Sequence, residues 1–474
     1  MSTELPLDTK NNELLLGGKS PVKCPALLLS APASNQGKTM VTAALAYHHR
    51  KQGRRVKVFK TGPDFLDPMI LEQASGQPVD PLDLWMVGES GCAKLLFEAA
   101  QKYDVLLVEG VMGLNDGKPS TADLARRFRL PVVMVMDITG MAETSAALAS
   151  GLISYNADLQ VLGFLANNAG SERHAAVVAT ALKEHYLGAL MRDPRLEIPR
   201  RHLGLAQASE IDKLESRFQT MAESLQTTPL AALPEAVEFL PPEVSASRST
   251  NNPAPSYPPP AIGKLLQGRR IGVARDSAFS FIYSANLRLL EEMGAELSYF
   301  SPVNDIVCPA TDAIYLPGGY PELYLKDLGN NFTMREAFHK HHKRGGIIYA
   351  ECGGMLYLLD SLTDKEGNSA TMLGLLKGSA RLQARLSALG HQYFHTAYGA
   401  LRGHTFHYSS MTGAEEVLTQ ARKKLGGNPG ESLLVNAQAN IAASYMHAYF
   451  PSNPRAVAGI FNGEIKQVFS QPQS

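Results

Sequence analysis

Short hydrophobic runs recur along the first half of the chain, and each is followed by a turn-rich or helical segment. The runs predict strands at residues 26–30, 56–59, 104–109, 131–137 and 159–167. Most of them do not alternate between apolar and polar residues, which is typical of strands that are buried on both faces of a parallel sheet. With helical patterns at residues 40–50 and 142–153 between them, they predict an α/β domain with a doubly wound, mainly parallel sheet.

A proline-rich stretch interrupts this pattern at residues 228–260, and the pattern then starts again. Strand-like runs at residues 270–274, 313–316 and 347–350 alternate with helical patterns at residues 283–293 and 332–343. The 474 residues also exceed what a single core usually sustains. We therefore predict an N-terminal tail over 1–21, a first α/β domain over 22–227, a linker over 228–265, a second doubly wound α/β domain over 266–467 and a C-terminal tail over 468–474.

Composition narrows the class of protein. Lys plus Arg and Asp plus Glu both number 45, so the formal charge is +0 and nothing indicates a nucleic-acid partner. The four cysteines have no short spacing, which argues against a zinc site or a disulfide framework and favours a reducing compartment. With no apolar run of ~18 residues and no signal-peptide core, we expect a cytoplasmic enzyme that does not bind membranes.

Residues 31–39, APASNQGKT, follow the first strand and precede a helical pattern. Strand, loop and helix in this order match the phosphate-binding loop G-x-x-x-x-G-K-[ST]. Gly37, Lys38 and Thr39 fit the pattern, whereas Pro32 stands at the first glycine position. The backbone amides, the lysine charge and a hydroxyl for Mg²⁺ are retained, so we predict a nucleotide site here rather than a chance G-K-T.

Acidic residues follow two neighbouring strands. Asp64 and Asp67 lie in a turn-rich loop after residues 56–59, and Glu109 ends the strand at residues 104–109. The carboxyl ends of parallel strands face the ligand crevice, and nucleotidases place a magnesium carboxylate there. Glu109 is therefore the metal candidate, while turn chemistry alone remains an alternative for the two aspartates.

Cys352 directly follows the strand-like run at residues 347–350 and precedes Gly353 and Gly354. A nucleophile on a sharp strand-to-helix turn is exposed to substrate, and glycine lets the backbone make that turn. Amides at the start of the helix can stabilise a thiolate or an oxyanion. The alternative is a buried structural cysteine, which is common.

A thiol nucleophile needs a base, and histidine is the usual one. Of the 13 histidines, His447 is the first candidate because it lies in a strand-like run over residues 442–450. His404 and His407 are the next candidates, although their alternation is also typical of cross-strand pairing.

Ordered motifs in both halves resemble known families. In the second half the motifs are LPGGYPE at 316–322, AECGGM at 350–355, GHTFHYS at 403–409 and SYMH at 444–447, and in the first half they lie at 33–39, 60–68, 109–117 and 201–205. The second half resembles the class I, triad-type glutamine amidotransferases of cobalamin biosynthesis. The first half resembles the dethiobiotin synthetase-like P-loop ATPase domain that is joined to them in the cobyrinic or hydrogenobyrinic acid a,c-diamide synthases. The resemblance covers roughly residues 21–454.

The resemblance implies roles for residues of the second half. Cys352 would attack the side-chain amide of glutamine with His447 as the base, and Gly318, Gly319 and Gly353 would supply the oxyanion site. Most triad amidotransferases carry a glutamate two residues after the histidine, where this chain has Tyr449. The partner that orients His447 is therefore undefined by the sequence.

In the first half, the resemblance implies an ATP site, a Mg²⁺ site and a substrate site. The implied residues are Asn35, Gln36, Gly37, Lys38 and Thr39 for ATP, Thr39 and Glu109 for Mg²⁺, and Asp64, Leu66, Asp67 and Asp116 for the substrate. The implied activity is that of a ligase that uses ATP and glutamine. It would convert the a and c carboxylates of a corrinoid, cobyrinic or hydrogenobyrinic acid, to amides through acyl phosphates.

Other activities remain open at this point. A nickel-sirohydrochlorin a,c-diamide synthase shares nearly all of these motifs, and cobyric acid synthase differs from them over residues 109–117. A regulatory P-loop ATPase that binds a protein partner would explain the phosphate loop but has no use for Cys352 and His447. The sequence leaves open whether the protein forms a homodimer.

Overall fold

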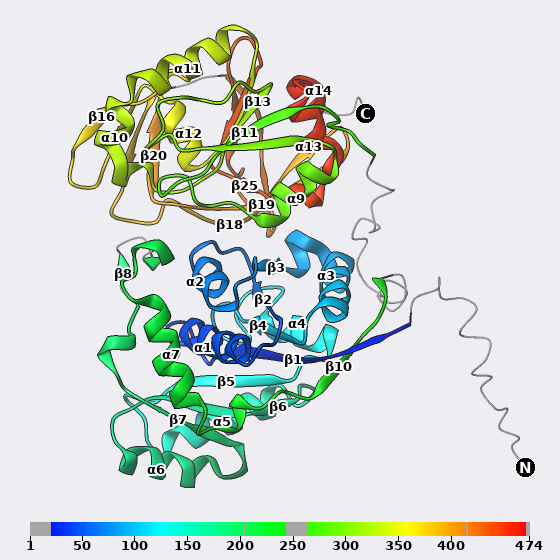
Figure 1. The fold of residues 1–474 in the computed structure, drawn as a ribbon, viewed down its shortest axis with the longest axis vertical. Helices are drawn as coiled ribbons and strands as arrows, with labels where there is room; N and C mark the ends of the chain where they lie inside the picture. The colour runs from blue at the N-terminus through cyan, green and yellow to red at the C-terminus, as the bar shows by residue number, and fades with distance from the viewer. Residues whose placement is uncertain are drawn as a thin grey trace, which may run out of the picture. The chain divides into compact units, whose positions relative to one another are not determined.

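The computed structural model describes residues 20–198, 200–201, 204–205, 207–242, 263–413 and 416–470. The chain divides into two compact units, Met1–Pro259 and Pro260–Ser474, each with its own central sheet (Figure 1). The predicted tails over 1–21 and 468–474 lie mostly outside the described residues. No helix in the described part of the chain has the length and the apolar character needed to cross a membrane.

The first unit is built on a parallel sheet with the strand order β3-β2-β4-β1-β5-β6-β7. Its strands are β1 (Val22–Ser30), β2 (Val56–Thr61), β3 (Asp80–Leu82), β4 (Val105–Glu109), β5 (Val132–Asp137), β6 (Val161–Ala169) and β7 (Tyr186–Met191). Its α-helices are α1 (Lys38–Lys51), α2 (Leu66–Ser75), α3 (Glu89–Lys102), α4 (Thr121–Phe128), α5 (Thr144–Tyr155), α6 (Glu172–Leu182) and α7 (Leu214–Leu225). Shorter turns are the π-helix η1 (Leu84–Gly88) and the 3-10 turns η2 (Lys183–His185), η3 (Pro194–Leu196), η4 (Ala208–Glu210) and η5 (Pro229–Ala231).

Both faces of this sheet are covered. Leu27 and Leu29 of β1 pack into a core with α1, α2 and α7, and Leu28, which points to the opposite face, is also fully buried. Because successive side chains of a strand point to opposite faces, a strand covered on both sides reads as an unbroken apolar run. The predicted doubly wound fold is therefore confirmed for this half.

The segment predicted as a linker from residue 228 is partly folded against the first unit. β10 (Ala236–Phe239) pairs antiparallel with the start of β1, with Val22 opposite Phe239. Leu230 and Phe239 are buried. The start of β1 extends beyond its pairing with β4 and β5, so its backbone groups need another partner, and β10 supplies it. Residues 243–262 of the predicted linker lie outside the described residues.

A short hairpin follows β7 in the chain. Its strands are β8 (Arg200–Arg201) and β9 (Gly204–Leu205), which pair antiparallel. They belong to the motif at 201–205, of which residues 202 and 203 lie outside the described residues.

The second unit has a central sheet in the order β12-β11-β13-β14-β24-β23-β21. Strands β12 to β24 of this order run parallel, and β23 and β21 add antiparallel strands at one edge. The strands are β11 (Arg270–Ala274), β12 (Glu296–Phe300), β13 (Ala313–Leu316), β14 (Ile347–Glu351), β21 (Glu416–Gln420), β23 (Ser432–Val435) and β24 (Ile441–Ser444). The helices are α9 (Ser284–Glu292), α10 (Leu325–Asn330), α11 (Phe332–Lys343), α12 (Gly353–Leu358), α13 (Pro454–Phe461) and α14 (Ile465–Val468), with 3-10 turns η6 (Pro321–Tyr324) and η7 (Phe450–Ser452).

Two smaller sheets accompany the central sheet and were not predicted. One has the order β16-β15-β17-β20, and the other has the order β22-β18-β19-β25. Their strands are β15 (Ser361–Thr363), β16 (Ser369–Thr371), β17 (Ser379–Leu382), β18 (Ala388–Thr396), β19 (Gly399–His407), β20 (Ser409–Thr412), β22 (Arg422–Lys423) and β25 (His447–Ala448).

The predicted single strand over residues 442–450 is wrong. β24 ends at Ser444, and the chain then leaves the central sheet and enters β25, which pairs with β19. Every residue from Ala442 to Phe450 is buried, so hydrophobicity alone does not show where one strand ends and the next begins.

Candidate active site

The loop between β1 and α1 has the backbone of a phosphate-binding loop. Asn35 and Gly37 have φ angles of 64° and 92°, in the left-handed region. A Cβ on Gly37 would lie 2.2 Å from Nδ2 of Asn167, which donates a hydrogen bond to the Gln36 carbonyl at 3.0 Å. Position 37 thus requires glycine for two reasons, its left-handed backbone angle and the close approach of Asn167 from β6. The free amides at the start of α1 can bind an anion.

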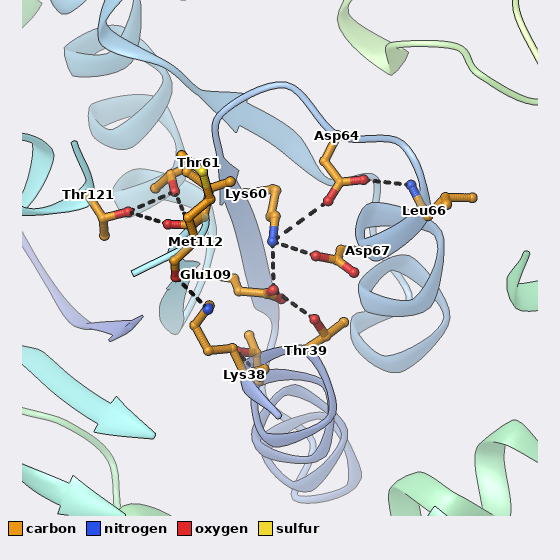
Figure 2. A network of polar contacts seen from close by, with 12 residues as sticks. Lys38, Thr39, Lys60, Thr61, Asp64, Leu66, Asp67, Glu109, Met112 and Thr121 are labelled. Carbon is orange, nitrogen blue, oxygen red and sulfur yellow. Dashed lines mark hydrogen bonds and ion pairs between the residues drawn. The ribbon is translucent and has the colours of Figure 1, made fainter. Parts of the chain in front are cut away.

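Carboxylates from β4, from α2 and from the loop that precedes α2 converge beside this loop (Figure 2). Nζ of Lys60, near the end of β2, lies 2.6 Å from Asp67 Oδ2, 2.7 Å from Glu109 Oε1 and 3.8 Å from Asp64 Oδ2. The Thr39 hydroxyl donates to Glu109 Oε1 at 2.9 Å. The structure therefore brings together the predicted metal residues and two predicted substrate residues around Lys60, which the sequence analysis did not single out.

Burial dominates the electrostatics of this cluster. It raises the pKa of Glu109 to about 7, against the opposing effect of Lys60. Burial and the neighbouring Asp67 raise the pKa of Asp64 to about 8. Burial would also raise the pKa of Asp67, but Lys60 outweighs it and the pKa of Asp67 is lowered. One lysine thus faces one buried and two partly buried carboxyl groups, so a further positive charge would be favourable there.

The donor set fits Mg²⁺. Glu109 Oε2 is buried and has no hydrogen-bond partner among the described residues, and the Thr39 hydroxyl donates to the other oxygen of the same carboxylate. Mg²⁺ prefers oxygen ligands and usually takes one or two carboxylates together with substrate phosphates and water. The described residues contain no group of three or more His, Cys, Asp or Glu arranged to hold a metal ion. A site that depends on nucleotide phosphates for its remaining ligands agrees with both observations.

Lys38, the lysine predicted to bind ATP, contacts backbone carbonyl groups of two loops. Nζ of Lys38 donates to the carbonyls of Met112 at 2.6 Å and of Ala33 at 3.3 Å. Burial, with a smaller contribution from the charge of Lys60, lowers the pKa of Lys38 to about 8. Both effects disfavour the charged form of the lysine, and a bound phosphate anion would favour it.

A cavity of about 970 Å³ connects these groups. Its lining includes the predicted residues Asn35, Gln36, Gly37, Lys38, Thr39, Asp64, Asp67 and Glu109, together with Lys60, Asp137 and Asn167, which were not predicted. Leu66 and Asp116 are not in the lining. The Leu66 amide donates to Asp64 Oδ1 at 2.9 Å, and Asp116 Oδ2 accepts from the Gly113 amide at 2.9 Å. These two residues therefore hold the shape of loops beside the cavity.

Cys352 stands on a sharp turn between β14 and α12. Its φ of 45° and ψ of −109° are strained for a residue with a side chain, and it is only 6% exposed. Its amide donates to the Ser444 carbonyl of β24 at 2.7 Å. A Cβ on Gly353 would lie 2.8 Å from the Gly319 carbonyl oxygen, and one on Gly354 would lie 2.3 Å from that of Leu316. The glycines thus allow the turn to press against the loop that follows β13.

His447 faces the same loop from the other side. A Cβ on Gly318 would lie 2.2 Å from Cε1 of the His447 ring. His447 pairs with His404 across β25 and β19, and the two rings stack at 5.1 Å. The cross-strand interpretation of His404 is therefore correct. The glycine pair Gly318-Gly319 contacts His447 on one side and Gly353, next to Cys352, on the other, so the structure gathers all five residues predicted for this site.

Both reactive groups are neutral at rest. Burial raises the pKa of the Cys352 thiol well above its usual range, and the charge of Glu322 adds to this effect. Burial lowers the pKa of His447 to about 3, with a further contribution from His407. A neutral imidazole is the form that can accept a proton from a thiol.

His407, another histidine that the sequence offered as a base, contacts Glu431 and Tyr445. Its Nε2 lies 3.3 Å from Glu431 Oε1, and its ring stacks on Tyr445 at 3.7 Å.

Glu351 was missed by the sequence analysis. It precedes Cys352, is buried, accepts from the Ala448 amide at 2.9 Å through Oε1, and accepts from the Tyr315 hydroxyl at 2.8 Å through Oε2. The hydrogen bond from Ala448 therefore connects the residue after His447 to the strand that directly precedes Cys352. An acidic residue at the end of an apolar strand was the available signal.

Comparison with known proteins identifies both halves. Residues 27–205 match the model of the CobQ/CobB/MinD/ParA nucleotide binding domain, and residues 270–455 match the CobB/CobQ-like glutamine amidotransferase domain.

Whole-length relatives extend this match. The hydrogenobyrinate a,c-diamide synthase of Pseudomonas aeruginosa is 51% identical over 440 residues, which cover 92% of this chain and 97% of that protein. The protein of the same name from Stutzerimonas stutzeri is 51% identical over 439 residues, covering 92% and 98%. The cobyrinate a,c-diamide synthase of Herminiimonas arsenicoxydans is 43% identical over 441 residues, covering 93% and 97%. The chain therefore belongs to the family of hydrogenobyrinate and cobyrinate a,c-diamide synthases.

Proposed function

We propose that this protein uses ATP and glutamine to convert the a and c carboxylates of a corrinoid to amides in cobalamin biosynthesis. The observation that carries the proposal is the presence in one chain of a phosphate-loop cavity lined by carboxylates and a strained cysteine turn beside a neutral histidine. An amide ligase of this kind needs both, because one site activates the carboxylate and the other releases ammonia. Relatives that are 51% identical over 92% of the chain carry the name of this activity.

The cysteine site would release ammonia from glutamine. The thiol proton of Cys352 passes to His447, and the sulfur attacks the carbonyl carbon of the glutamine side-chain amide. The amides of Gly319 and Gly353, with Gly318 beside them, would stabilise the oxyanion. The carbon–nitrogen bond breaks as His447 returns the proton to nitrogen, and ammonia leaves. Water then hydrolyses the γ-glutamyl thioester and yields glutamate.

The phosphate-loop site would activate the corrinoid. An oxygen of the substrate carboxylate attacks the γ-phosphorus of ATP, ADP leaves, and an acyl phosphate forms. Ammonia then attacks the carbonyl carbon and expels phosphate. The amides of residues 35–39 and the Lys38 charge would hold the nucleotide phosphates, and Thr39 and Glu109 would hold Mg²⁺, which neutralises phosphate charge when bound. Asp64 and Asp67, with loops shaped through Leu66 and Asp116, would face the corrinoid.

We propose hydrogenobyrinate as the preferred substrate over cobyrinate. The two relatives at 51% identity are named for hydrogenobyrinate, and the relative at 43% is named for cobyrinate. A panel of cobalt-free, cobalt-containing and nickel-containing tetrapyrroles, offered with ATP and glutamine, tests the choice. It also tests the alternatives of a nickel-sirohydrochlorin diamide synthase and a cobyric acid synthase. Fastest turnover of a cobalt-containing or nickel-containing substrate would contradict the proposal.

The decisive experiment compares two nitrogen sources in the full-length protein. Cys352→Ser should lose amidation with glutamine and retain it with ammonium chloride, because only the ammonia-releasing step needs the thiol. Lys38→Ala should lose amidation with either source. Cys308→Ser, a partly buried cysteine away from the turn, is the matched control and should resemble the wild type. Loss of both activities in Cys352→Ser would contradict the assignment of ammonia release and amidation to two separate sites. A regulatory ATPase would show no amidation at all.

A further inference from the structure

Three carboxyl groups, two of them buried and one partly buried, act electrostatically on the cysteine. The charges of Glu322, Glu431 and Glu351 all act on the Cys352 thiol, and Glu322 has the largest effect of the three. Each of these charges opposes thiolate formation, which the proposed chemistry requires. The presence of an acidic side chain beside a thiol nucleophile therefore requires an explanation.

Two of the three carboxyl groups have structural partners. Glu351 accepts hydrogen bonds from the Ala448 amide and the Tyr315 hydroxyl. Glu431 lies 3.3 Å from His407 Nε2 and accepts from the Thr405 hydroxyl at 3.3 Å. The positions of these two groups are thus explained by contacts within the protein.

Among the described residues, the hydrogen bond to the Glu322 carboxyl group comes from its own backbone amide. Glu322 is 8% exposed, and among the described residues no side chain forms an ion pair or a hydrogen bond with its carboxyl group. It lies on η6, three residues after Gly319, and η6 packs against α12, the helix that begins after Cys352. Burial raises the pKa of Glu322 to about 7, because no cation compensates for the lost water. A buried carboxylate without a counter-charge is unfavourable.

We propose that Glu322 binds the α-ammonium group of glutamine beside Cys352. This inference rests on the proposed use of glutamine and names the residue that recognises its amino-acid end. Glutamine carries one permanent cation, and Glu322 is the buried carboxylate near the thiol that, among the described residues, has neither a cation nor a hydrogen-bond donor on another residue. Once the ammonium is bound, the charge of Glu322 is compensated, so thiolate formation at Cys352 is less strongly opposed when substrate is present.

Glutaramate, which is glutamine without the α-amino group, tests the proposal directly. Ammonia release would be measured with each compound in the presence of ATP and the corrinoid. For the wild-type protein, kcat/KM should be at least ~30-fold higher with L-glutamine, because a buried charge pair that loses one partner typically costs 2 kcal/mol or more. In Glu322→Gln this preference should fall to within about threefold, since the amide cannot compensate an ammonium charge. Glu366→Gln, the same change on an exposed loop, is the matched control and should keep the wild-type ratio.

The outcomes separate this inference from the proposed function. Equal rates with glutamine and glutaramate in the wild-type protein would overturn the inference without any variant. A Glu322→Gln protein that keeps the full preference for glutamine would also overturn it. Absence of ammonia release from glutamine by the wild-type protein would instead overturn the proposed function on which the inference rests.

Discussion

Gly318 offers the sharpest test of the cysteine site. In Gly318→Ala the new methyl carbon would lie 2.2 Å from Cε1 of His447 and 3.0 Å from its Nδ1. Ordinary contact begins at 3.4 Å, so the ring must withdraw by about 1.2 Å, from 2.2 to 3.4 Å. His447 is buried in contact with His404 and Phe281, which limits any small adjustment.

A misplacement of about 1 Å in a catalytic group costs on the order of 100-fold in rate, which corresponds to about 2.7 kcal/mol. We therefore expect Gly318→Ala to lower kcat/KM for glutamine-dependent amidation by about 100-fold. Amidation driven by ammonium chloride should stay within about twofold of the wild type, because the phosphate-loop unit is unaltered.

The assay is the rate of amide formation with each nitrogen source, followed as loss of the corrinoid carboxylate. Gly263→Ala is the matched control, since no atom lies within 4 Å of the Cβ that this change would add. Wild-type glutamine-dependent activity in Gly318→Ala would refute the assignment of His447 as the base. An equal loss with both nitrogen sources would indicate general misfolding and would refute the reasoning from local contact.

Three further changes test other contacts. Glu109→Gln should reduce amidation from either nitrogen source and raise the Mg²⁺ concentration at half-maximal rate, and an unchanged Mg²⁺ dependence would contradict the metal site. Lys60→Met should lower the free energy of unfolding by about 3 kcal/mol, because it leaves the buried Glu109 and the partly buried Asp67 without their cation. The loss should be larger at pH 8 than at pH 5, where the carboxylates can take up protons, and urea titrations at both pH values measure this. Burial raises the pKa of Glu351 from 4.5 to about 8, so folding favours the neutral acid, and its stabilising contribution is complete below pH 4.5 and is lost as the pH rises through 8. Glu351→Gln, which mimics the neutral acid, should therefore destabilise less at pH 9 than at pH 5, and equal destabilisation at both would contradict the shift.

The sequence by itself determined the local elements of both units. The apolar runs located β1, β4, β13 and β14, and the helical pattern at residues 332–343 matches α11. The phosphate loop and the cysteine turn were also recognisable, because each depends on a few consecutive residues between a strand and a helix. Such features are set by backbone geometry and burial over a short stretch, so the amino-acid order is enough to predict them.

Tertiary structure decided which distant residues meet. The sequence did not show that β10 completes β1, that residues 442–450 divide between two sheets, or that Gly318 lies against His447. The motifs at 60–68 and 316–322 include Lys60 and Glu322, but locally they are an ordinary lysine after an apolar run and an ordinary glutamate after a proline. Their significance comes from neighbours far away in the chain and from the loss of water around them, and both arise only when the sheets and helices are packed together.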